Sequence, residues 1–524
     1  MLVIEEKKAV AISNYAIIVS PDDNVAVVKS EIVSGTDVVL PDGSTLSVIS
    51  DVIPGHRFST CEIPAGDFVL QYGQPIGTSL GIRAGELVSH DNMTNEVPVV
   101  RDLPDDLYTP APDYFTVEES GTFKGFRRPD GRVGTRNFIL IVPTSMCASH
   151  EATQIAMMAE FMHYSREKYP NVDGVVAIPH NKGCGCQDGS NLDVMLRTLS
   201  NYADHPNVGG VILMDLGCEK TNLQYVEKYL YKREKSFAKR VEKIGIQETG
   251  GTQAAIERGL KIVEEMLPEV NAAEREDIPV SELVLGVKCG GSDGFSGISA
   301  NPSLGQCSDL VVRSGGTVLI TEVPEFCGAE HILVDRAKDA ATGRKIYEMV
   351  DWYKDYAAKF GAVLNQNPSP GNVAGGLLNI TIKSLGAIAK AGTTRVEGVV
   401  EYGEVPTARG VNLMQGPGYD QESTPGLVAA GATVVVFTTG RGTTIGNAIV
   451  PVIKLTSNTP VFERMSGDLD LSAGGVIDGT ETIEQVGKRL FEHVKKVASG
   501  EILAKAEIHK HREFQFWAEQ AVSL

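Results

Sequence analysis

Residues 1–99 alternate short apolar runs with turn-forming pairs such as Pro41-Asp42-Gly43 and Pro54-Gly55. Short apolar runs with a turn signal every eight to twelve residues are typical of a small all-β domain. We therefore expect strands at residues 15–19, 25–28, 45–48 and 68–72. Residues 100–120 are rich in Pro, Asp, Tyr and Thr without a clear period, which predicts a linker.

From residue 121 to 524 the pattern changes to unbroken apolar runs separated by helical stretches. Apolar strands that alternate with helices predict a parallel sheet covered by helices on both faces. Expected strands lie at 137–143, 174–178, 210–216, 282–287, 316–321, 433–438 and 450–455, with a weaker one at 243–247. Expected helices include 152–168, 222–242, 252–266 and 483–498, and a mostly helical insert, broken at NQNPSPG, spans 330–394.

Composition narrows the class of protein. A chain of 524 residues exceeds what one hydrophobic core usually organises, so we expect two or three domains. The net charge of −19 disfavours nucleic acids and anionic membrane surfaces as partners. No apolar run is long enough for a membrane span, and the start MLVIEEKK does not resemble a signal peptide. We therefore expect a cytoplasmic protein with eight reduced cysteines.

Four cysteines follow directly after expected strands: Cys147, Cys184, Cys218 and Cys289. The loops at the carboxyl ends of parallel strands converge on one crevice, so these thiols are expected to meet. Several cysteinates together would hold a soft metal or an iron–sulfur cluster. Cysteine is also among the most often buried residues, so packing in the core is the alternative role for each of the four. Three others are expected only to pack: Cys61, Cys307 and Cys327.

Three expected strands open into loops of glycine and small polar residues: GCGCQDGS (183–190), KCGGSDGFSG (288–297) and TTGRGTTIGN (438–447). Such loops let backbone N–H groups approach an anion, and Arg441 between two glycines is able to grip a carboxylate. None matches a Walker A or dinucleotide-binding pattern. Asp293 fits either a helix N-cap, which we favour, or a metal ligand.

Among the histidines, His180 follows an expected strand and precedes Cys184, so it is a candidate general base or ligand. A core histidine whose hydrogen bonds are satisfied is the alternative. His56 and His90 lie in turns of the β region, where histidine is common.

The segments GFRRPDGRVGTRN, GCGCQDG, LGCEK, KCGGSDGFSGISANP and FTTGRGTTIGN resemble the altronate and galactarate dehydratase family over nearly the whole chain. The resemblance implies an α/β protein in which a β-clip (SAF-like) domain precedes a dimerising middle domain and a Rossmann-like metal-binding domain. Family members are iron- or manganese-dependent hydro-lyases that act on sugar acids. The residues on family patterns are His56, His180, Cys184, Cys218, Cys289, Asp293 and the loop 439–442, while His90 matches only in part.

The resemblance therefore implies that the chain converts a 2,3-dihydroxy carboxylate to its 2-keto-3-deoxy product. A divalent metal is expected to bind the substrate, with Fe(II) favoured, Mn(II) possible and a cluster left open. Expected metal ligands are Cys147, Cys184, Cys218, Cys289 and Asp293, and the expected base is His180, with Lys182 or Lys220 as alternatives. Expected substrate-binding residues are Ser292, Thr439, Gly440, Arg441 and Gly442.

The segments GGSDGFSG and VNLMQGPGYD resemble the altronate branch more than the galactarate branch. A galactarate-type dehydratase and a sulfolactate sulfo-lyase of the same family are the alternatives. A nicotinamide oxidoreductase lacks its glycine fingerprint here, and a sugar-binding protein would not explain the cysteine and glycine loops. The expected assembly is a homodimer that binds a small anionic sugar acid.

Overall fold

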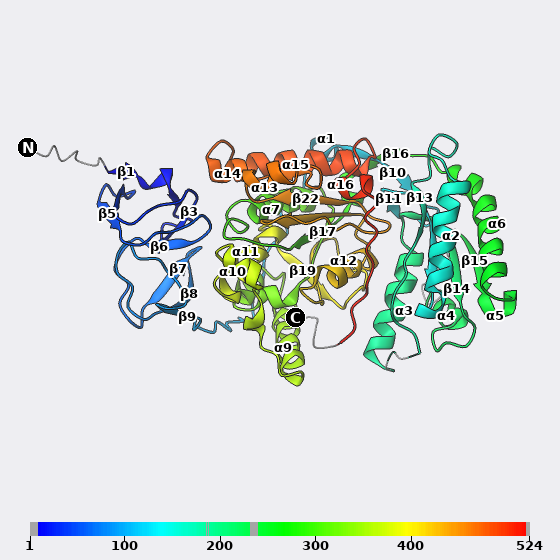
Figure 1. Cartoon of the computed structure of the whole chain (residues 1–524), viewed down its shortest axis with the longest axis horizontal. Coiled ribbons are helices and arrows are strands. Elements are labelled where there is room, and N and C mark those ends of the chain that lie inside the picture. The colour runs from blue at the N-terminus through cyan, green and yellow to red at the C-terminus, as the bar shows by residue number, and fades with distance from the viewer. Residues whose placement is uncertain (1–8, 185, 187, 231–238, 520–524) are drawn as a thin grey trace, which may run out of the picture.

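The computed structural model describes residues 9–519 except 185, 187 and 231–238 (Figure 1). The N-terminal region is a small all-β domain of three three-stranded sheets, as expected. Strands β3 and β5 coincide with the expected runs, and β2 and β7 are shorter than expected. The strands are β1 (Val10–Ala11), β2 (Ala16–Ile17), β3 (Val25–Val28), β4 (Thr36–Val39), β5 (Thr45–Val48), β6 (Arg57–Ser59), β7 (Phe68–Gln71), β8 (Gln74–Ser79) and β9 (Met93–Thr94).

The segment that follows the β domain runs along the large α/β region. Phe115 donates its backbone N–H to the carbonyl of Arg313 at 2.7 Å, and Tyr108 forms an isolated bridge with Asp339. A short helix, α1 (Val117–Ser120), precedes a small antiparallel sheet of β10 (Thr122–Arg127), β11 (Val133–Gly134) and β16 (Glu276–Pro279). No helix in the described part of the chain is long and apolar enough to cross a bilayer.

The α/β region contains two parallel sheets rather than the single sheet expected. The first has four strands in the order β13-β12-β14-β15. They are β12 (Phe138–Pro143), β13 (Gly174–Ala177), β14 (Val208–Asp215) and β15 (Arg240–Gly245), with helices α2 (Ser149–Met162), α3 (Ser190–Ala203), α4 (Leu223–Leu230), α5 (Ile246–Thr249) and α6 (Thr252–Asn271). The prediction of a helix at 222–242 is wrong at its end, because β15 begins at Arg240. Residues 231–238 of this expected helix lie outside the described residues.

The second sheet has seven strands in the order β19-β20-β18-β17-β21-β22-β23. They are β17 (Val284–Cys289), β18 (Thr317–Ile320), β19 (Val396–Val400), β20 (Gly410–Met414), β21 (Val434–Thr439), β22 (Val452–Thr456) and β23 (Leu471–Ser472). Every strand pairing in this sheet is parallel. All six residues of β21 are buried, and so are all six residues of β12, an inner strand of the first sheet. This burial explains why these strands are continuous apolar runs.

Helices lie on both faces of the second sheet, as expected. The crossover from β17 to β18 carries α7 (Ala300–Arg313), and the crossover from β20 to β21 carries α12 (Asp420–Ala429). These crossovers run in opposite directions along the sheet, so right-handed connections place them on opposite faces. The remaining helices are α8 (Glu330–Asp335), α9 (Ala340–Lys359), α10 (Pro370–Ala374), α11 (Ile380–Ile388), α13 (Thr459–Arg464), α14 (Gly474–Asp478), α15 (Ile483–Ala498) and α16 (Lys505–Ile508).

The β domain packs against the insert of the second sheet through three glycines. A Cβ atom on Gly294 or Gly376 would overlap the carbonyl oxygen of Gly55, so only glycine allows this approach. Next to it, the fully buried Arg57 donates from Nη2 to the carbonyl of Gly376. The Pro54–Arg57 turn is therefore built into the α/β region at the loop that precedes α11.

We predict that Gly376→Ala lowers the melting temperature more than Gly431→Ala does. Both glycines have φ near +100° (+100° and +104°), so both substitutions introduce backbone strain, but a Cβ at Gly431 meets nothing within 4 Å. The additional overlap at Gly376 should cost about 1–3 kcal/mol, in the range of overpacked sites. Differential scanning calorimetry measures the difference, and equal melting temperatures would show that the interface relaxes freely.

Candidate active site

The second sheet has a topological switch point between β17 and β21, where a crevice opens at the carboxyl ends of the strands. Two of the glycine loops meet there. The backbone N–H groups of Gly440 and Arg441 donate to the carbonyl of Gly291 at 3.1 and 2.8 Å. The third loop, residues 183–190, follows β13 and belongs to the first sheet, so it lies at a different sheet edge from the other two.

Asp293 organises this pair of loops. Its carboxylate accepts hydrogen bonds from Ser296 Oγ (2.9 Å), Ser457 Oγ (2.9 Å) and Asn458 Nδ2 (3.0 Å), and burial raises its pKa. A Cβ on Gly440 would overlap this carboxyl group. Asp293 is not a helix N-cap, because α7 begins only at Ala300. Its oxygens are occupied by protein donors, which favours a structural role over the expected metal ligation.

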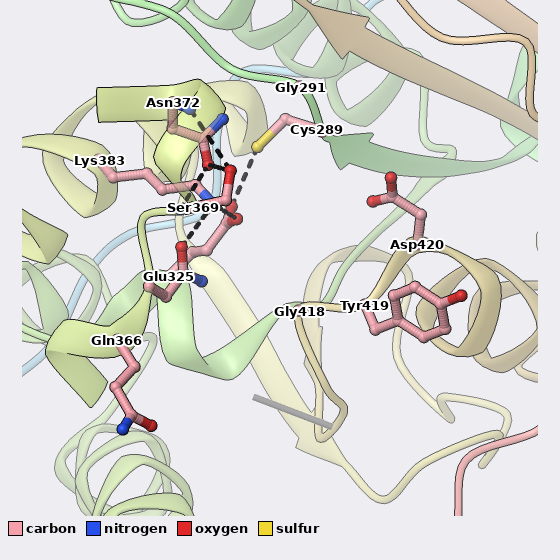
Figure 2. Close-up of a pocket in the computed structure, with 12 residues that line it drawn as sticks. Cys289, Gly291, Glu325, Gln366, Ser369, Asn372, Lys383, Gly418, Tyr419 and Asp420 are labelled. Atoms are coloured by element: carbon pink, nitrogen blue, oxygen red, sulfur yellow. Dashed lines mark hydrogen bonds and ion pairs between the residues drawn. The ribbon is translucent and has the colours of Figure 1, made fainter. Parts of the chain in front are cut away.

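A cavity of about 260 Å³ lies beside the end of β17 (Figure 2). This volume is just below the roughly 300–1,000 Å³ typical of pockets for drug-sized ligands, and so suits a smaller one. Its walls come from the loops after β17, β18 and β20 and from the helical insert. They carry amides, hydroxyls, carboxyls, a thiol and an ammonium group: Cys289, Gly290, Gly291, Glu325, Gln366, Asn367, Ser369, Asn372, Lys383, Gly418, Tyr419 and Asp420.

At this wall and behind it, buried lysines contact carboxylates, all of them buried except that of the partly exposed Asp420. Lys288 pairs with Glu322 and, at 2.7 Å, with Asp420, while Lys390 lies 3.0 Å from Glu322. Lys383 lies 2.8 Å from Glu325. The side chains of Lys288, Lys390 and Glu322 are 0% exposed, so each charge depends on its partners for stabilisation.

The thiol of Cys289 sits inside the same network. Its Sγ donates to Glu325 Oε2 at 3.0 Å and accepts from Lys390 Nζ at 3.1 Å. Burial and the neighbouring Glu325 raise the pKa of Cys289, which keeps the thiol protonated. Burial alone would also raise the pKa of Glu325, but Lys383 and Lys390 outweigh it and hold that pKa well below its usual range.

Cys289, Glu322 and Glu325 offer ligand atoms within 4.8 Å of one another. A divalent cation does not fit this set, because Lys288, Lys383 and Lys390 already neutralise its carboxylates at hydrogen-bonding distance. An added cation would face three ammonium groups across a few ångströms of low-dielectric space. The network is therefore not supported as the expected metal centre.

The other three cysteines lie apart from Cys289, at the carboxyl edge of the first sheet. Cys147, Cys184 and Cys218 follow β12, β13 and β14, which are neighbours in that sheet, and all three are exposed. Their loops touch: Met146 N donates to Lys182 O at 2.6 Å, and Thr221 Oγ1 donates to Thr144 O at 2.7 Å. The structure does not bring the four thiols together. Cys289 belongs to the other sheet, and Cys147, Cys184 and Cys218 do not form a group with ligand atoms within 4.8 Å of one another in the described part of the chain. Exposed thiols are the type of ligand that a soft metal or a cluster prefers.

His180 lies beside these cysteines but is not available as a base. Its Nε2 donates to the carbonyl of Pro143 at 2.9 Å, and its Nδ1 accepts from the backbone N–H of Lys182 at 3.2 Å. Burial lowers its pKa to about 4, so the ring stays neutral. Both ring nitrogens are hydrogen-bonded to the backbone, so His180 is the core histidine with satisfied hydrogen bonds that was the alternative to a base or ligand.

The remaining predicted residues are dispersed. Lys220 pairs with Asp188 at 2.9 Å near the three cysteines. His90 is exposed in a turn of the β domain, whereas His56 is half-buried, with Nε2 3.4 Å from the carbonyl of Ala374. Of the three residues expected only to pack, Cys307 and Cys327 are buried, and Cys61 is exposed.

The predicted anion-binding residues border a second hollow rather than the cavity beside β17. Arg441 is exposed and lines a cavity of about 440 Å³ together with Asp293, Gly440 and Lys29 of the β domain. Thr439 Oγ1 accepts from the N–H of Gly442 at 3.0 Å and so shapes the loop. Ser292 is buried, and its Oγ has no hydrogen-bond partner among the described residues.

Three family models match consecutive parts of the chain. The altronate/galactarate dehydratase SAF domain matches residues 14–96, the D-galactarate dehydratase/altronate hydrolase second domain matches 125–271, and the D-galactarate/altronate dehydratase C-terminal domain matches 280–522. The chain is 37% identical to altronate dehydratase of Bacillus subtilis over 464 residues, 88% of this chain and 90% of that protein. The chain belongs to the altronate and galactarate dehydratase family.

Two further relatives are similar over most of the chain. Galactarate dehydratase (L-threo-forming) of Escherichia coli is 38% identical over 498 residues, 93% of both chains. The (2R)-sulfolactate sulfo-lyase subunit beta of Chromohalobacter salexigens is 32% identical over 396 residues, 75% of this chain and 96% of that subunit. Overall identity therefore does not separate altronate from galactarate as the substrate.

Sequence reasoning missed the charged residues of the network: Lys288, Glu322, Glu325, Lys383, Lys390 and Asp420. One signal was available. Lys288 ends an apolar strand directly before Cys289, and a lysine inside a buried strand needs an acidic partner. The partners come from segments that are remote in sequence, so the pattern alone could not name them.

Proposed function

We propose that the chain is a hydro-lyase that converts an altronate-type sugar acid to its 2-keto-3-deoxy product in the cavity beside β17. Membership of the dehydratase family supports the reaction. The wall of amides, hydroxyls and charged groups supports a polyhydroxy acid as the ligand, because each substrate hydroxyl needs a partner once it leaves water. The cavity lies at the carboxyl ends of parallel strands, the edge of the sheet at which such folds bind ligands.

The proposed reaction breaks two bonds of the substrate. The proton on C2 passes to a general base, and the C3 hydroxyl leaves as water after it receives a proton. The resulting enol then takes up a proton at C3, loses the proton of its C2 hydroxyl and becomes the 2-keto acid. Because a proton next to a carboxylate is very weakly acidic, the enzyme must stabilise the charge that accumulates on the carboxylate oxygens.

The number of cationic groups that line the cavity favours an aldonate over an aldarate. Among the described residues that line it, Lys383 provides the single ammonium group, which suits a substrate with one carboxylate. A galactarate-type substrate has two and is the second candidate. The sulfo-lyase relative is a subunit that spans three quarters of this chain, and elimination of sulfite is the third candidate.

We further propose that the enzyme holds a divalent metal, with iron favoured over manganese, or an iron–sulfur cluster. Cys147, Cys184 and Cys218 are the residues that would hold it, since thiolates prefer iron–sulfur clusters and soft metals to manganese. When bound, such a group would supply a Lewis acid at the carboxyl edge of the first sheet, outside the lining of the cavity beside β17. Cys289 and Asp293 are left out of this ligand set because their side chains already have protein partners.

We also propose a cytoplasmic homodimer. All eight cysteines are free thiols, which supports a reducing compartment. Helix α2 exposes Met157, Phe161 and Met162 to 61, 91 and 60%, an apolar face of the kind that marks interfaces. Sedimentation velocity should give a dimer for the wild type and a monomer for Phe161→Glu. A wild-type chain that stays monomeric at micromolar concentration would contradict the proposal.

We predict that enzyme purified without oxygen and supplied with ferrous iron forms 2-keto-3-deoxy acid from altronate. The kcat/KM for altronate should exceed that for galactarate by about tenfold or more, since an aldarate leaves one carboxylate without a cationic partner. A coupled assay for the keto acid across altronate, galactarate and (2R)-sulfolactate checks this. Release of sulfite from sulfolactate without keto acid from either sugar acid would reject dehydration.

We predict that Cys184→Ser and Cys218→Ser protein contain much less iron than the wild type, whereas Cys289→Ser protein keeps it. The reason is that the first two thiols are exposed at one sheet edge and the third is hydrogen-bonded in the lysine network. Iron analysis and visible absorbance of anaerobically purified proteins measure the content. Loss of iron only in Cys289→Ser would move the metal to the other sheet.

A further inference from the structure

Lys383 has a position that sets it apart from the other lysines of the network. It lies on α11, its side chain is 9% exposed, and it lines the cavity, whereas Lys288 and Lys390 are fully buried behind the wall. Its Nζ lies 2.8 Å from Glu325 Oε1 and 2.8 Å from Asn367 Oδ1. An ammonium group has three N–H donors, so one remains for a ligand in the cavity. Figure 2 shows the side chain reaching in from the helical insert, opposite Asp420.

The surrounding structure fixes this ammonium group. Asn379 caps α11 by accepting from Ile382 N at 3.0 Å, and its Nδ2 donates to the carbonyl of Ile76 in the β domain at 2.7 Å. The ion pair with Glu325 holds the far end of the side chain. Burial would lower the pKa of Lys383, but Glu325 and the neighbouring groups raise it above its usual value, so the group stays charged.

We propose that Lys383 binds the reacting carboxylate of the substrate and stabilises the enolate, with Glu325 as its positioning residue. This inference rests on the proposed function. Removal of the C2 proton converts the carboxylate from a monoanion to a dianion, so a cation in contact with its oxygens is bound more tightly in the transition state than in the ground state. Lys383 neither gains nor loses a proton in this step.

The alternative anchor is Arg441, which the glycine loop presents on the second hollow. Arg441 is exposed, does not line the cavity beside β17 and has a local environment open to water. Charge stabilisation is stronger where water is excluded, which favours the largely buried Lys383 over Arg441. The largely buried ammonium group of Lys383, rather than the exposed guanidinium of Arg441, therefore contacts the substrate carboxylate.

The test compares Lys383→Met, Lys383→Arg and Arg441→Met with wild-type enzyme. The matched control is Lys354→Met, which removes a lysine paired at 3.0 Å with Glu330 away from the cavity. For Lys383→Met we expect kcat to fall by about 100-fold or more, in the range for loss of one charge-stabilising donor, with a smaller rise in KM. Lys383→Arg should recover part of kcat, and Lys354→Met and Arg441→Met should stay within about threefold of wild type.

Two further measurements keep the test independent of folding and of turnover. Methylamine should restore activity to Lys383→Ala, which a misfolded protein would not permit. Calorimetric titration with a 3-deoxy-hexonate, which lacks the leaving hydroxyl, should give at least tenfold weaker binding to Lys383→Met than to wild type. Wild-type enzyme without turnover of any sugar acid would reject the proposed function. Active wild type, with Lys383→Met unchanged or with the loss in Arg441→Met instead, would overturn the role of Lys383 alone.

Discussion

The buried charge network at the end of β17 is the constraint on which the site depends. Removing an ammonium or carboxylate group from water costs several kcal/mol even after relaxation, and only close partners offset that cost. Lys288, Lys383 and Lys390 therefore cannot move away from Glu322, Glu325 and Asp420 without a large penalty. Because these side chains come from β17, the segment after β18, helix α11, the turn that follows α11 and the start of α12, their pairing fixes the relative position of all these elements.

The same network decides what the site can bind. At an effective dielectric constant of about 20, a divalent ion 4 Å from one ammonium group is repelled by about 8 kcal/mol. The carboxylates attract the ion by a similar amount, so the network offers no net attraction to offset dehydration of the ion. A sugar-acid carboxylate, in contrast, can accept a hydrogen bond from Lys383, because the ammonium group reaches the cavity surface with one N–H donor not used by Glu325 or Asn367.

The sequence predicted what depends on local pattern. The small β domain, the core strands of the α/β region and helix α15 are where hydrophobic periodicity put them. It failed where the outcome depends on distant partners. Strands β19 and β20 went unpredicted because VEGVV and GVNLM carry polar residues at central positions. Lys383 and Lys390 look like ordinary exposed lysines in a helical insert, and only the fold reveals that they face Glu325 and Glu322.

The two sheets give the chain two switch-point crevices with opposite chemistry. The ends of β12, β13 and β14 carry exposed thiols. In the second sheet, the ends of β17 and β21 carry two glycine loops, and the lysine network lies at the ends of β17, β18 and β20. A single crevice would place a metal cation beside three ammonium groups, which the repulsion above disfavours. Division into two sheets separates these charges, and the β domain then contributes through the glycine contact at Gly55 and the bond from Asn379 to Ile76. The β domain thus helps to position Lys383, because a shift of that domain would move Asn379, the cap of α11.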